Sequence, residues 1–318
     1  MLKPLPVLRT TYRSTDYLQG QYPADADYQE IITESTRVIK PNGELLGVYL
    51  KGVVPKKLAL EAFEVLKGAD LQSKNRGLST HAGEQVRVVN PNGTRSKTNQ
   101  LPEAVNSGII GYYDRYTRTP YCRECAWNRQ HPEQWQKLYP YVAFIDKAMA
   151  TYAPEHHRRQ LEFARRTNPA WVIGSTAFTT ITVNQSYQTA VHKDAGDLKE
   201  GIGVISCLRA GDYSGGYLVL PEYQVAFDLG SCDVLLFDVH AWHGNTTLNS
   251  SPGSLRVTCV FYYRENMIRC GTPEYELATV EARKPKSPIW SHEEVAKGND
   301  LATQALVAAA LTKTPPGG

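Results

Sequence analysis

Thr189-Ala-Val-His192-Lys-Asp194-Ala-Gly-Asp197 is the stretch around which the rest of the chain can be ordered. It places an imidazole and a carboxylate two residues apart. Residues i and i+2 of a β-strand lie on the same face of a sheet, so His192 and Asp194 can approach one metal ion from one side. We therefore predict a metal site in a strand-rich part of the chain.

A second imidazole comes from Phe237-Asp-Val-His240-Ala-Trp-His243-Gly-Asn245, which contains two candidates. Two His and one carboxylate on one face form the facial triad of non-haem Fe(II) oxygenases, which leaves positions open for a co-substrate and O₂. His240 and His243 have opposite parity, so a strand pattern alone does not decide between them. We favour His243 because Gly-Asn follows it and because of its distance to Arg256.

Arg256 lies thirteen residues after His243, in Ser254-Leu-Arg-Val-Thr-Cys-Val-Phe-Tyr-Tyr-Arg264, an apolar run of strand type. A guanidinium on a core-facing strand requires a carboxylate partner. The distal carboxylate of 2-oxoglutarate would provide one. The residues thus predict Fe(II), 2-oxoglutarate and O₂ as the cofactors of one site.

Short strand-like segments dominate the chain from residue 171 onward, and turn signals such as Ser214-Gly-Gly separate them. Strands of this number and spacing are typical of a double-sheet jelly roll. We predict an α+β fold: a double-stranded β-helix (jelly roll) core braced by helices, with an N-terminal α/β extension. The expected strands cover residues 171–173, 177–184, 190–193, 202–208, 216–220, 225–229, 234–239 and 255–263.

Three parts are expected along the chain. Residues 1–70 form the N-terminal extension, with a hairpin over 30–51 and a helix over 57–66. Residues 71–280 form the jelly-roll core with its substrate-facing loops and bracing helices. Residues 281–318 form a C-terminal appendage.

Helical spacing of apolar residues predicts two bracing helices, over 134–153 and 155–166, and a short helix over 299–311 in the appendage. Residues 70–108 lack such periodicity and are polar, basic and rich in Asn. Long segments of this kind are usually functional or disordered. Two interpretations stay open: a segment that closes over a phosphate backbone, or a mobile insertion.

The composition of the 318-residue chain suits an intracellular globular protein. Its net charge of +3 is compatible with a nucleic-acid partner but does not require one. The chain start lacks an apolar signal core and no run reaches the roughly 18 apolar residues of a membrane span. Six Cys, several of them in apolar runs, indicate a reducing compartment and no disulfides. A zinc site at Cys122-x-x-Cys125 would need two more ligands, and only His131 is near.

Several further segments accompany the metal and arginine motifs. They are Gly111-Tyr-Tyr-Asp-Arg, Pro120-Tyr-Cys-Arg-Glu-Cys-Ala-Trp, Thr182-Val-Asn184, His192-Lys-Asp194, His243-Gly-Asn245 and Arg256-Val-Thr-x-Val-x-Tyr-x-Arg264-x-Asn-Met267. With these motifs, residues 70 to 270 resemble the TET/J-binding-protein family of nucleic-acid-modifying Fe(II)/2-oxoglutarate dioxygenases. The chain lacks a Cys-rich insert and so looks closer to compact phage, algal and fungal members than to the animal enzymes.

The resemblance implies that His192, Asp194 and His243 bind iron and that Arg256 anchors 2-oxoglutarate. It also implies that Asp197 contacts the target base during catalysis. A carboxylate can accept a hydrogen bond from the exocyclic amine of cytosine, which favours 5-methylcytosine over thymine. Alternatively, Asp197 caps the turn at residues 195–196. Some algal relatives use ascorbate, which stays open as a reductant or as a co-substrate.

The predicted function is oxidation of the 5-methylcytosine methyl group in double-stranded DNA, after the base has been flipped out of the helix. We expect a monomer that works wherever its DNA lies, in the nucleus or in a host cytoplasm. Alternatives are ascorbate-dependent modification, thymine hydroxylation, a 2-oxoglutarate hydroxylase of a different substrate, and a DNA-binding module on an inactive jelly roll. Further candidates are phosphate contacts at Arg76, Arg115 and Arg123, base stacking at Trp242, and co-substrate contact or a turn at Asn184.

Overall fold

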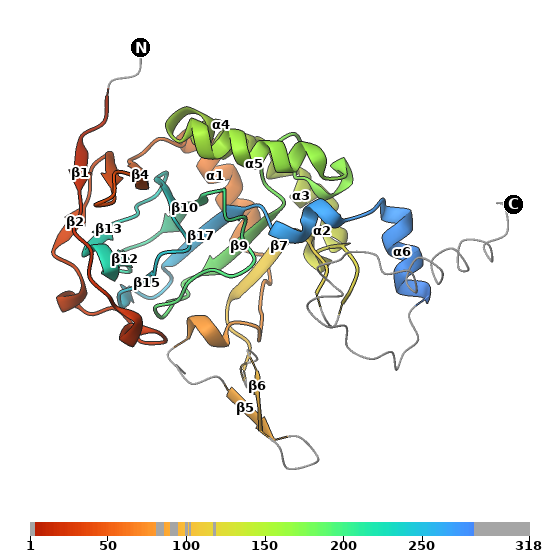
Figure 1. Cartoon of the computed structure of the whole chain (residues 1–318), viewed down its shortest axis with the longest axis horizontal. Helices are drawn as coiled ribbons and strands as arrows, with labels where there is room; N and C mark the ends of the chain where they lie inside the picture. The colour runs from red at the N-terminus through yellow and green to blue at the C-terminus, as the bar shows by residue number, and fades with distance from the viewer. Residues whose placement is uncertain are drawn as a thin grey trace, which may run out of the picture.

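The structure is a computed structural model, and it describes residues 4–80, 86–89, 95–98, 101, 103–116 and 119–282. Two β-sheets face each other at its centre (Figure 1). The larger sheet has nine strands. In spatial order they are β1 (Val7–Arg9), β3 (Thr36–Ile39), β4 (Leu45–Leu50), β14 (Val234–Phe237), β10 (Gly203–Ala210), β17 (Leu255–Tyr262), β9 (Thr180–Gln185), β7 (Ser107–Tyr113) and β8 (Arg123–Glu124).

The smaller sheet has four strands in the order β15 (Gly244–Asn245), β12 (Leu218–Leu220), β13 (Val225–Phe227) and β2 (Glu30–Ile32). A separate two-stranded sheet pairs β11 (Tyr213–Gly215), which precedes β12 in the chain, with β16 (Leu248–Ser250), which follows β15. Side chains from the nine-stranded and the four-stranded sheet fill the layer between these two sheets, as in a sandwich. These include Leu46, Tyr49, Ile205, Leu218, Phe227, Leu235 and Phe237. The predicted double-sheet jelly roll is confirmed.

Helices cover the outer face of the nine-stranded sheet (Figure 1). The helices α1 (Lys56–Leu66), α3 (Pro132–Lys137) and α4 (Tyr139–Tyr152) pack on that face, and α5 (Pro154–Arg166) packs against α4. The helix expected over 134–153 is two helices. Pro140 explains the division, because it lacks the N–H that would continue α3 but lies in the first turn of α4, where no such bond is needed.

The first 70 residues belong to both sheets. The strands β3 and β4 form the expected hairpin, with Thr36 opposite Tyr49, and β4 joins the large sheet through β14. The strand β2 instead pairs in parallel with β13 of the small sheet. The N-terminal α/β extension is therefore continuous with the jelly roll.

Two expected strands do not form. Residues 171–173 lie at a 3-10 turn, η4 (Pro169–Trp171), because the side chain of Asn168 accepts a hydrogen bond from the N–H of Ala170 and begins the turn. Residues 190–193 form a loop in which only His192 makes an isolated bridge. The segment 70–108 was expected to lack regular structure, but it contains η3 (Gly77–Ser79) and a hairpin of β5 (Val86–Val89) and β6 (Arg95–Thr98).

The prediction of no disulfides is wrong, because Cys122 and Cys270 are bonded. They are 148 residues apart, so the pairing could not be read from local spacing. Cys125, the other member of the C-x-x-C pair, is a buried free thiol, and no zinc site forms there among the described residues.

The last element of the described part of the chain is α6 (Pro273–Ala282). The helix expected over 299–311 lies outside the described residues. No described helix has the length and apolar character needed to cross a membrane.

Candidate metal centre and active-site pocket

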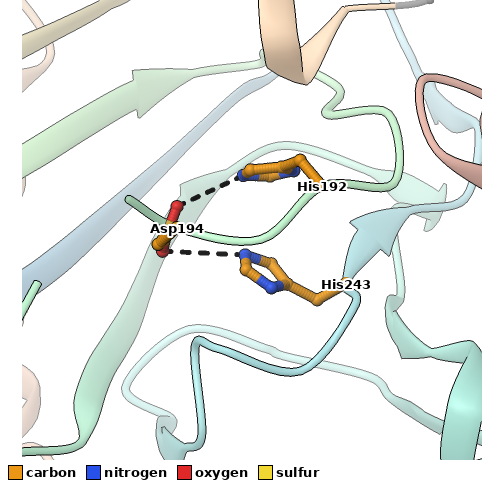
Figure 2. A group of neighbouring side chains, drawn as sticks. All are labelled: His192, Asp194 and His243. Carbon is orange, nitrogen blue, oxygen red and sulfur yellow. Dashed lines mark ion pairs between the residues drawn. The ribbon is translucent and has the colours of Figure 1, made fainter. Parts of the chain in front are cut away.

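His192, Asp194 and His243 converge at one edge of the sandwich (Figure 2). Nε2 of His192 lies 3.4 Å from Oδ1 of Asp194, and Nε2 of His243 lies 3.7 Å from Oδ2. One ligand atom from each residue falls within 4.8 Å of the others. Two imidazole nitrogens and a carboxylate at this spacing can share one metal ion.

Both imidazoles are oriented in the same way. Nδ1 of His192 lies 2.8 Å from the carbonyl of Ala190, and Nδ1 of His243 lies 2.9 Å from the carbonyl of Ala241. A carbonyl oxygen can only accept, so each Nδ1 carries the proton and each Nε2 keeps its lone pair. This second contact is the usual device that fixes the tautomer of a metal-binding His.

The two His are held together by their backbones rather than by a regular strand. The N–H of His192 donates to the carbonyl of His243, and the N–H of His243 donates back, at 2.9 and 3.0 Å. Gly244 permits this approach, since a Cβ there would lie 2.9 Å from the backbone N of Val191. The expectation of a strand at His192 was wrong, although the expected proximity to Asp194 occurs.

The charges of the three groups suit metal binding at neutral pH. Burial opposes the ionisation of Asp194, but the hydrogen bond from His192 and the charge of His243 bring its pKa to about 2. Burial, and then the neighbouring His192, lower the pKa of His243 to about 4. At pH 7 the carboxylate is therefore ionised and His243 is neutral, which are the forms that bind metals.

His240, the rival to His243, points elsewhere. Its Nδ1 lies 3.2 Å from Asp238, which in turn pairs with Lys40 at 2.8 Å. Its side chain is about one-third exposed, at 36 %, whereas that of His243 is 6 % exposed. His243 is thus the member of the pair that the fold brings to the cluster.

Arg256 lies in the same pocket as the three ligands and is buried. Among the described residues, its Nη2 has no hydrogen-bond partner and no carboxylate forms an ion pair with it. The guanidinium contacts the thiol of Cys207 but no carboxylate, and a buried cation without a counter-charge is costly and requires an anion. The site therefore fits a dicarboxylate co-substrate that reaches the metal with one end and Arg256 with the other.

Alternate residues of β17 line this pocket, from Arg256 through Thr258 and Val260 to Tyr262. The residues between them, such as Phe261, pack under the helices on the other face. The six steps from Arg256 to Tyr262 span about 20 Å of strand, so the lining extends well past the length of a small dicarboxylate. Tyr262 and, beyond the strand, Arg264 lie at its other end and were not singled out as site residues, although the parity of Arg256 could have indicated them.

Asn184 lies within β9, one residue before its end, and is paired with Thr258 of β17, so the alternative that it holds a turn is wrong. Its side chain lines the pocket, and its Oδ1 accepts a hydrogen bond of 2.6 Å from the hydroxyl of Ser107. This bond leaves the amide nitrogen as the donor that Asn184 can offer to a bound molecule.

Asp197 also lines the pocket, three residues beyond Asp194, and is buried. Burial and the negative charge of Asp194 raise its pKa well above the ordinary value, and Arg264 opposes this shift. The backbone around it is paired with that of Arg264. No side-chain hydrogen bond of Asp197 to the turn at 195–196 occurs in the described chain, so its carboxyl group faces the pocket without a capping role.

A groove adjoins the pocket, and Arg76, Tyr262 and Arg264 line both hollows. Nε of Arg76 is buried and has no hydrogen-bond partner among the described residues. The guanidinium groups of Arg264 and Arg123 lie over the Tyr113 ring, 4.2 and 4.4 Å from its centroid. The charged groups of the groove are Asp70, Arg76, Arg123, Glu124, Arg129 and Arg264.

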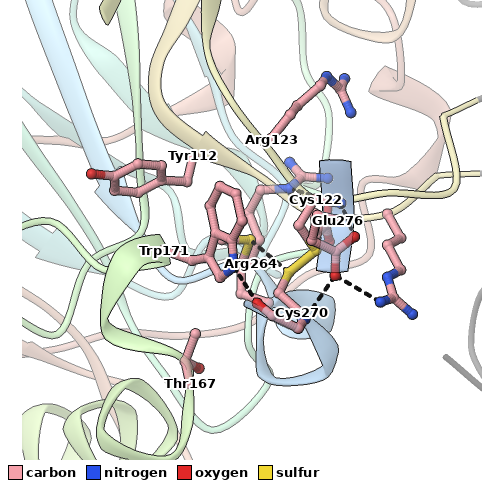
Figure 3. The surroundings of a disulfide bond; sticks show 12 residues. Tyr112, Cys122, Arg123, Thr167, Trp171, Arg264, Cys270 and Glu276 are labelled. Carbon is pink, nitrogen blue, oxygen red and sulfur yellow. Dashed lines mark hydrogen bonds and ion pairs between the residues drawn. A yellow bond between two sulfur atoms is a disulfide. The ribbon is translucent and has the colours of Figure 1, made fainter. Parts of the chain in front are cut away.

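Two predicted substrate contacts lie elsewhere. Arg115 is buried and pairs with Glu276 at 2.7 Å, so it cannot reach a phosphate. Glu276 lies beside the disulfide, where it accepts a hydrogen bond from the N–H of Cys122 (Figure 3). Trp242 does not line the pocket, because its indole N–H donates to Asp16 at 2.6 Å and Lys193 covers its ring. Both partners are remote in sequence from the residue they hold, so the sequence carried no signal of either contact.

A jelly roll whose pocket contains a His-Asp-His group and a buried arginine defines the class of 2-oxoglutarate/Fe(II) oxygenases. The model of the Tet_JBP family, described as the oxygenase domain of the 2OGFeDO superfamily, matches residues 108–265. The chain belongs to this TET/J-binding-protein family. Its members depend on Fe(II), 2-oxoglutarate and O₂, and the residues of the pocket fit these cofactors.

Relatives and solved structures support the same placement. Thymine dioxygenase JBP1 of Trypanosoma brucei brucei is 35% identical over 198 residues, which are 60% of this chain and 23% of that protein. Bifunctional helicase and thymine dioxygenase JBP2 of Leishmania braziliensis is 31% identical over 253 residues, 78% of this chain and 21% of that protein. The chain thus spans less than a quarter of the length of these relatives.

The structure of NgTET1 in complex with 5mC DNA matches with a TM-score of 0.50 and 14% identity, over 75% of this chain and 83% of that chain. At this identity the likeness bears on the fold alone. It agrees with the two-sheet core and the helices on its outer face.

Proposed function

We propose that this protein is an Fe(II)/2-oxoglutarate-dependent dioxygenase that oxidises the methyl group of 5-methylcytosine in double-stranded DNA. One observation carries the proposal: a single pocket joins the metal triad, Arg256 with its unpartnered Nη2, and a second end lined by Asp197, Tyr262 and Arg264. The first two parts suit the cofactors. The third offers an aromatic ring, a carboxyl group and a guanidinium to a planar base.

When bound, Fe(II) and 2-oxoglutarate activate O₂ and insert one oxygen atom into the methyl C–H bond, with release of succinate and CO₂. The chain's own residues orient the reactants. Arg256 holds the distal carboxylate of the co-substrate. Tyr262 provides a face on which a flipped base can stack, and Asp197 contacts the base edge. The buried walls exclude water from the reacting methyl group.

Asp197 bears on the choice of base. An ionised carboxylate accepts from N4 of 5-methylcytosine, whereas thymine has no donor there. Thymine is the second candidate, for two reasons. The raised pKa of Asp197 favours a neutral carboxyl group, which could donate to the O4 atom of thymine. The relatives named above are thymine dioxygenases.

Nucleoside mass spectrometry tests the proposal. Matched DNA duplexes with and without 5-methylcytosine are incubated with protein, Fe(II), 2-oxoglutarate and O₂. Loss of 5-methylcytosine with formation of a hydroxymethyl or more oxidised product, dependent on 2-oxoglutarate, is the expected result. Hydroxymethyluracil from thymine would instead establish the second candidate. Succinate release that ignores DNA altogether would contradict the nucleic-acid substrate.

Asp197→Ala is expected to lower kcat/KM for 5-methylcytosine DNA roughly 10- to 100-fold, since a good contact to a base edge contributes about 1–3 kcal/mol. The wild-type rate should also fall on acidification, because the accepting form disappears as the pH drops through the raised pKa of Asp197. The variant should lack this acid limb. Asp212→Ala, at an exposed position, is the control. Equal losses of kcat/KM with 5-methylcytosine and thymine substrates would exclude a role of Asp197 in selecting the base.

The neighbouring groove is the proposed path of the DNA backbone. It contains four arginines and two carboxylates. Arg264 is paired with the buried Asp114 at 2.7 Å, which leaves three arginines against two carboxylates and a lining that is net positive. Arg76 and Arg264 connect the groove to the base pocket. Arg123, supported by the ring of Tyr113, is the proposed phosphate contact there. Arg76 joins it through its unpartnered Nε.

Arg123→Ala is expected to weaken DNA binding by a similar factor for all sequences and to reduce the slope of log K against log salt concentration by about one. KM for 2-oxoglutarate should not change. Arg158→Ala removes an exposed charge from α5, on the helical side of the molecule, and should leave the slope unaltered. Fluorescence anisotropy over a salt series measures both. An unchanged slope in Arg123→Ala would place the DNA elsewhere.

A further inference from the structure

We infer that Glu222 is a positioning residue that clamps together, from outside the pocket, the two loops that carry the metal ligands. The inference rests on the proposed metal centre. Glu222 follows β12 in the turn η5 (Pro221–Tyr223), and its side chain is 6 % exposed. It does not line the pocket.

The carboxylate of Glu222 contacts both loops. Its Oε2 accepts a hydrogen bond of 3.0 Å from the backbone N–H of Trp242, which immediately precedes His243. Its Oε1 lies 3.8 Å from Nζ of Lys193, which stands between His192 and Asp194. One buried side chain therefore reaches the neighbours of all three ligands.

A third partner is the N-terminal segment, residues 12–21. The hydroxyl of Tyr12 donates to Oε1 of Glu222, and the backbone N–H of Arg13 donates to its carbonyl oxygen at 2.8 Å. Farther along the segment, Gly20 and Gln21 form two backbone hydrogen bonds of 2.8 Å with Val191, the residue before His192. The segment is thus joined to the ligand loops directly at Val191 and, through Tyr12, by the carboxylate of Glu222.

Lys193 and Trp242 also contact each other, since Nζ lies 4.7 Å from the centre of the indole ring. The indole N–H in turn binds Asp16 of the N-terminal segment. The result is a closed set of contacts around one carboxylate. The triad needs such support because its His residues sit on loops rather than in the middle of strands.

Loss of Glu222 should act on the metal through the ligand positions. Removing the carboxylate leaves the N–H of Trp242 without its acceptor and the ammonium of Lys193 without its ion-pair partner. The loops can then move apart, and the ligands lose their preset spacing. Residues that orient metal ligands typically change metal affinity by about 10- to 100-fold when replaced.

The experiment measures Co(II) binding, under anaerobic conditions, by the visible absorption of the bound ion. We expect Glu222→Ala to raise the Kd by about 10- to 100-fold. Glu222→Gln should show a smaller increase, because its amide oxygen still accepts from Trp242 but no longer pairs with Lys193. Glu276→Gln is the matched control: Glu276 is also buried, accepts two backbone N–H groups and pairs with Arg115, and it does not line the pocket. It should lower Tm without changing the Kd.

A metal-free readout accompanies the titration. In the apo protein, Glu222→Ala should speed tryptic cleavage after Arg13, because the segment loses the side-chain hydrogen bond that holds the neighbouring Tyr12, and Glu276→Gln should not. Wild-type Kd in Glu222→Ala, or an equal loss in Glu276→Gln, would overturn the inference. If the wild-type protein binds no Co(II) at the triad, as judged by an identical titration of His192→Ala, the proposed function fails. The cleavage rate then still decides whether Glu222 holds the segment.

Discussion

His243→Ala is expected to abolish methyl oxidation, with a loss of at least about a thousandfold, because a metal centre that contributes several kcal/mol is no longer held. The side chain is buried in the cluster, and its Nδ1 contact to Ala241 leaves Nε2 free to bind. His240→Ala is a closely matched control, since it removes the same ring from the same loop. His240 contacts Asp238 and the backbone of Asp197 rather than the cluster, so this variant should keep most activity.

Thermal unfolding gives a second measurement. A metal at one hundred times its Kd adds about 2.7 kcal/mol to the stability of the folded state. Co(II) should therefore raise Tm of the wild-type protein and of His240→Ala by several degrees, and that of His243→Ala hardly at all. The opposite ranking of the two variants would mean that the loop adopts another register and that His240 is the ligand.

The metal cluster illustrates how far local spacing predicts a site. The i, i+2 spacing predicted that His192 and Asp194 lie close together, and in the structure they do. The reason is different, however: the residues lie in a loop, and reciprocal backbone hydrogen bonds with His243 hold it. That pairing joins segments 51 residues apart, so no short window of sequence contains it.

Strand parity was the stronger guide for Arg256. Its place in an apolar run predicted a buried guanidinium, and the same alternation leads to Tyr262 at the other end of the pocket. Composition was the weaker guide for the arginines. Arg115 and Arg123 look alike in sequence, yet Arg115 pairs with Glu276, 161 residues away, and only Arg123 lines the groove. Burial of a charge depends on such distant partners, which spacing does not encode.

Arg256→Ala is expected to raise KM for 2-oxoglutarate by two orders of magnitude or more, because removing one partner of a buried charge pair costs about 2–5 kcal/mol. Arg256→Lys should recover only part of this loss, since an ammonium keeps the charge but not the two parallel donors. The affinity for Co(II) should stay near the wild-type value, because Arg256 is not a metal ligand. Succinate formation at varied 2-oxoglutarate concentration measures the effect.

Arg209→Ala provides the control, because Arg209 is the register partner of Arg256 on β10 but does not line the pocket. Its KM for 2-oxoglutarate should match that of the wild-type protein. The same assays separate the two co-substrates considered for the site. Ascorbate carries no distal carboxylate that needs the buried guanidinium, so an ascorbate-dependent enzyme would tolerate Arg256→Ala. The opposite result would be turnover that persists without 2-oxoglutarate and is unaffected by Arg256→Ala. Nη2 of Arg256 would then lack the anion that its burial requires, and the dicarboxylate assignment would be wrong.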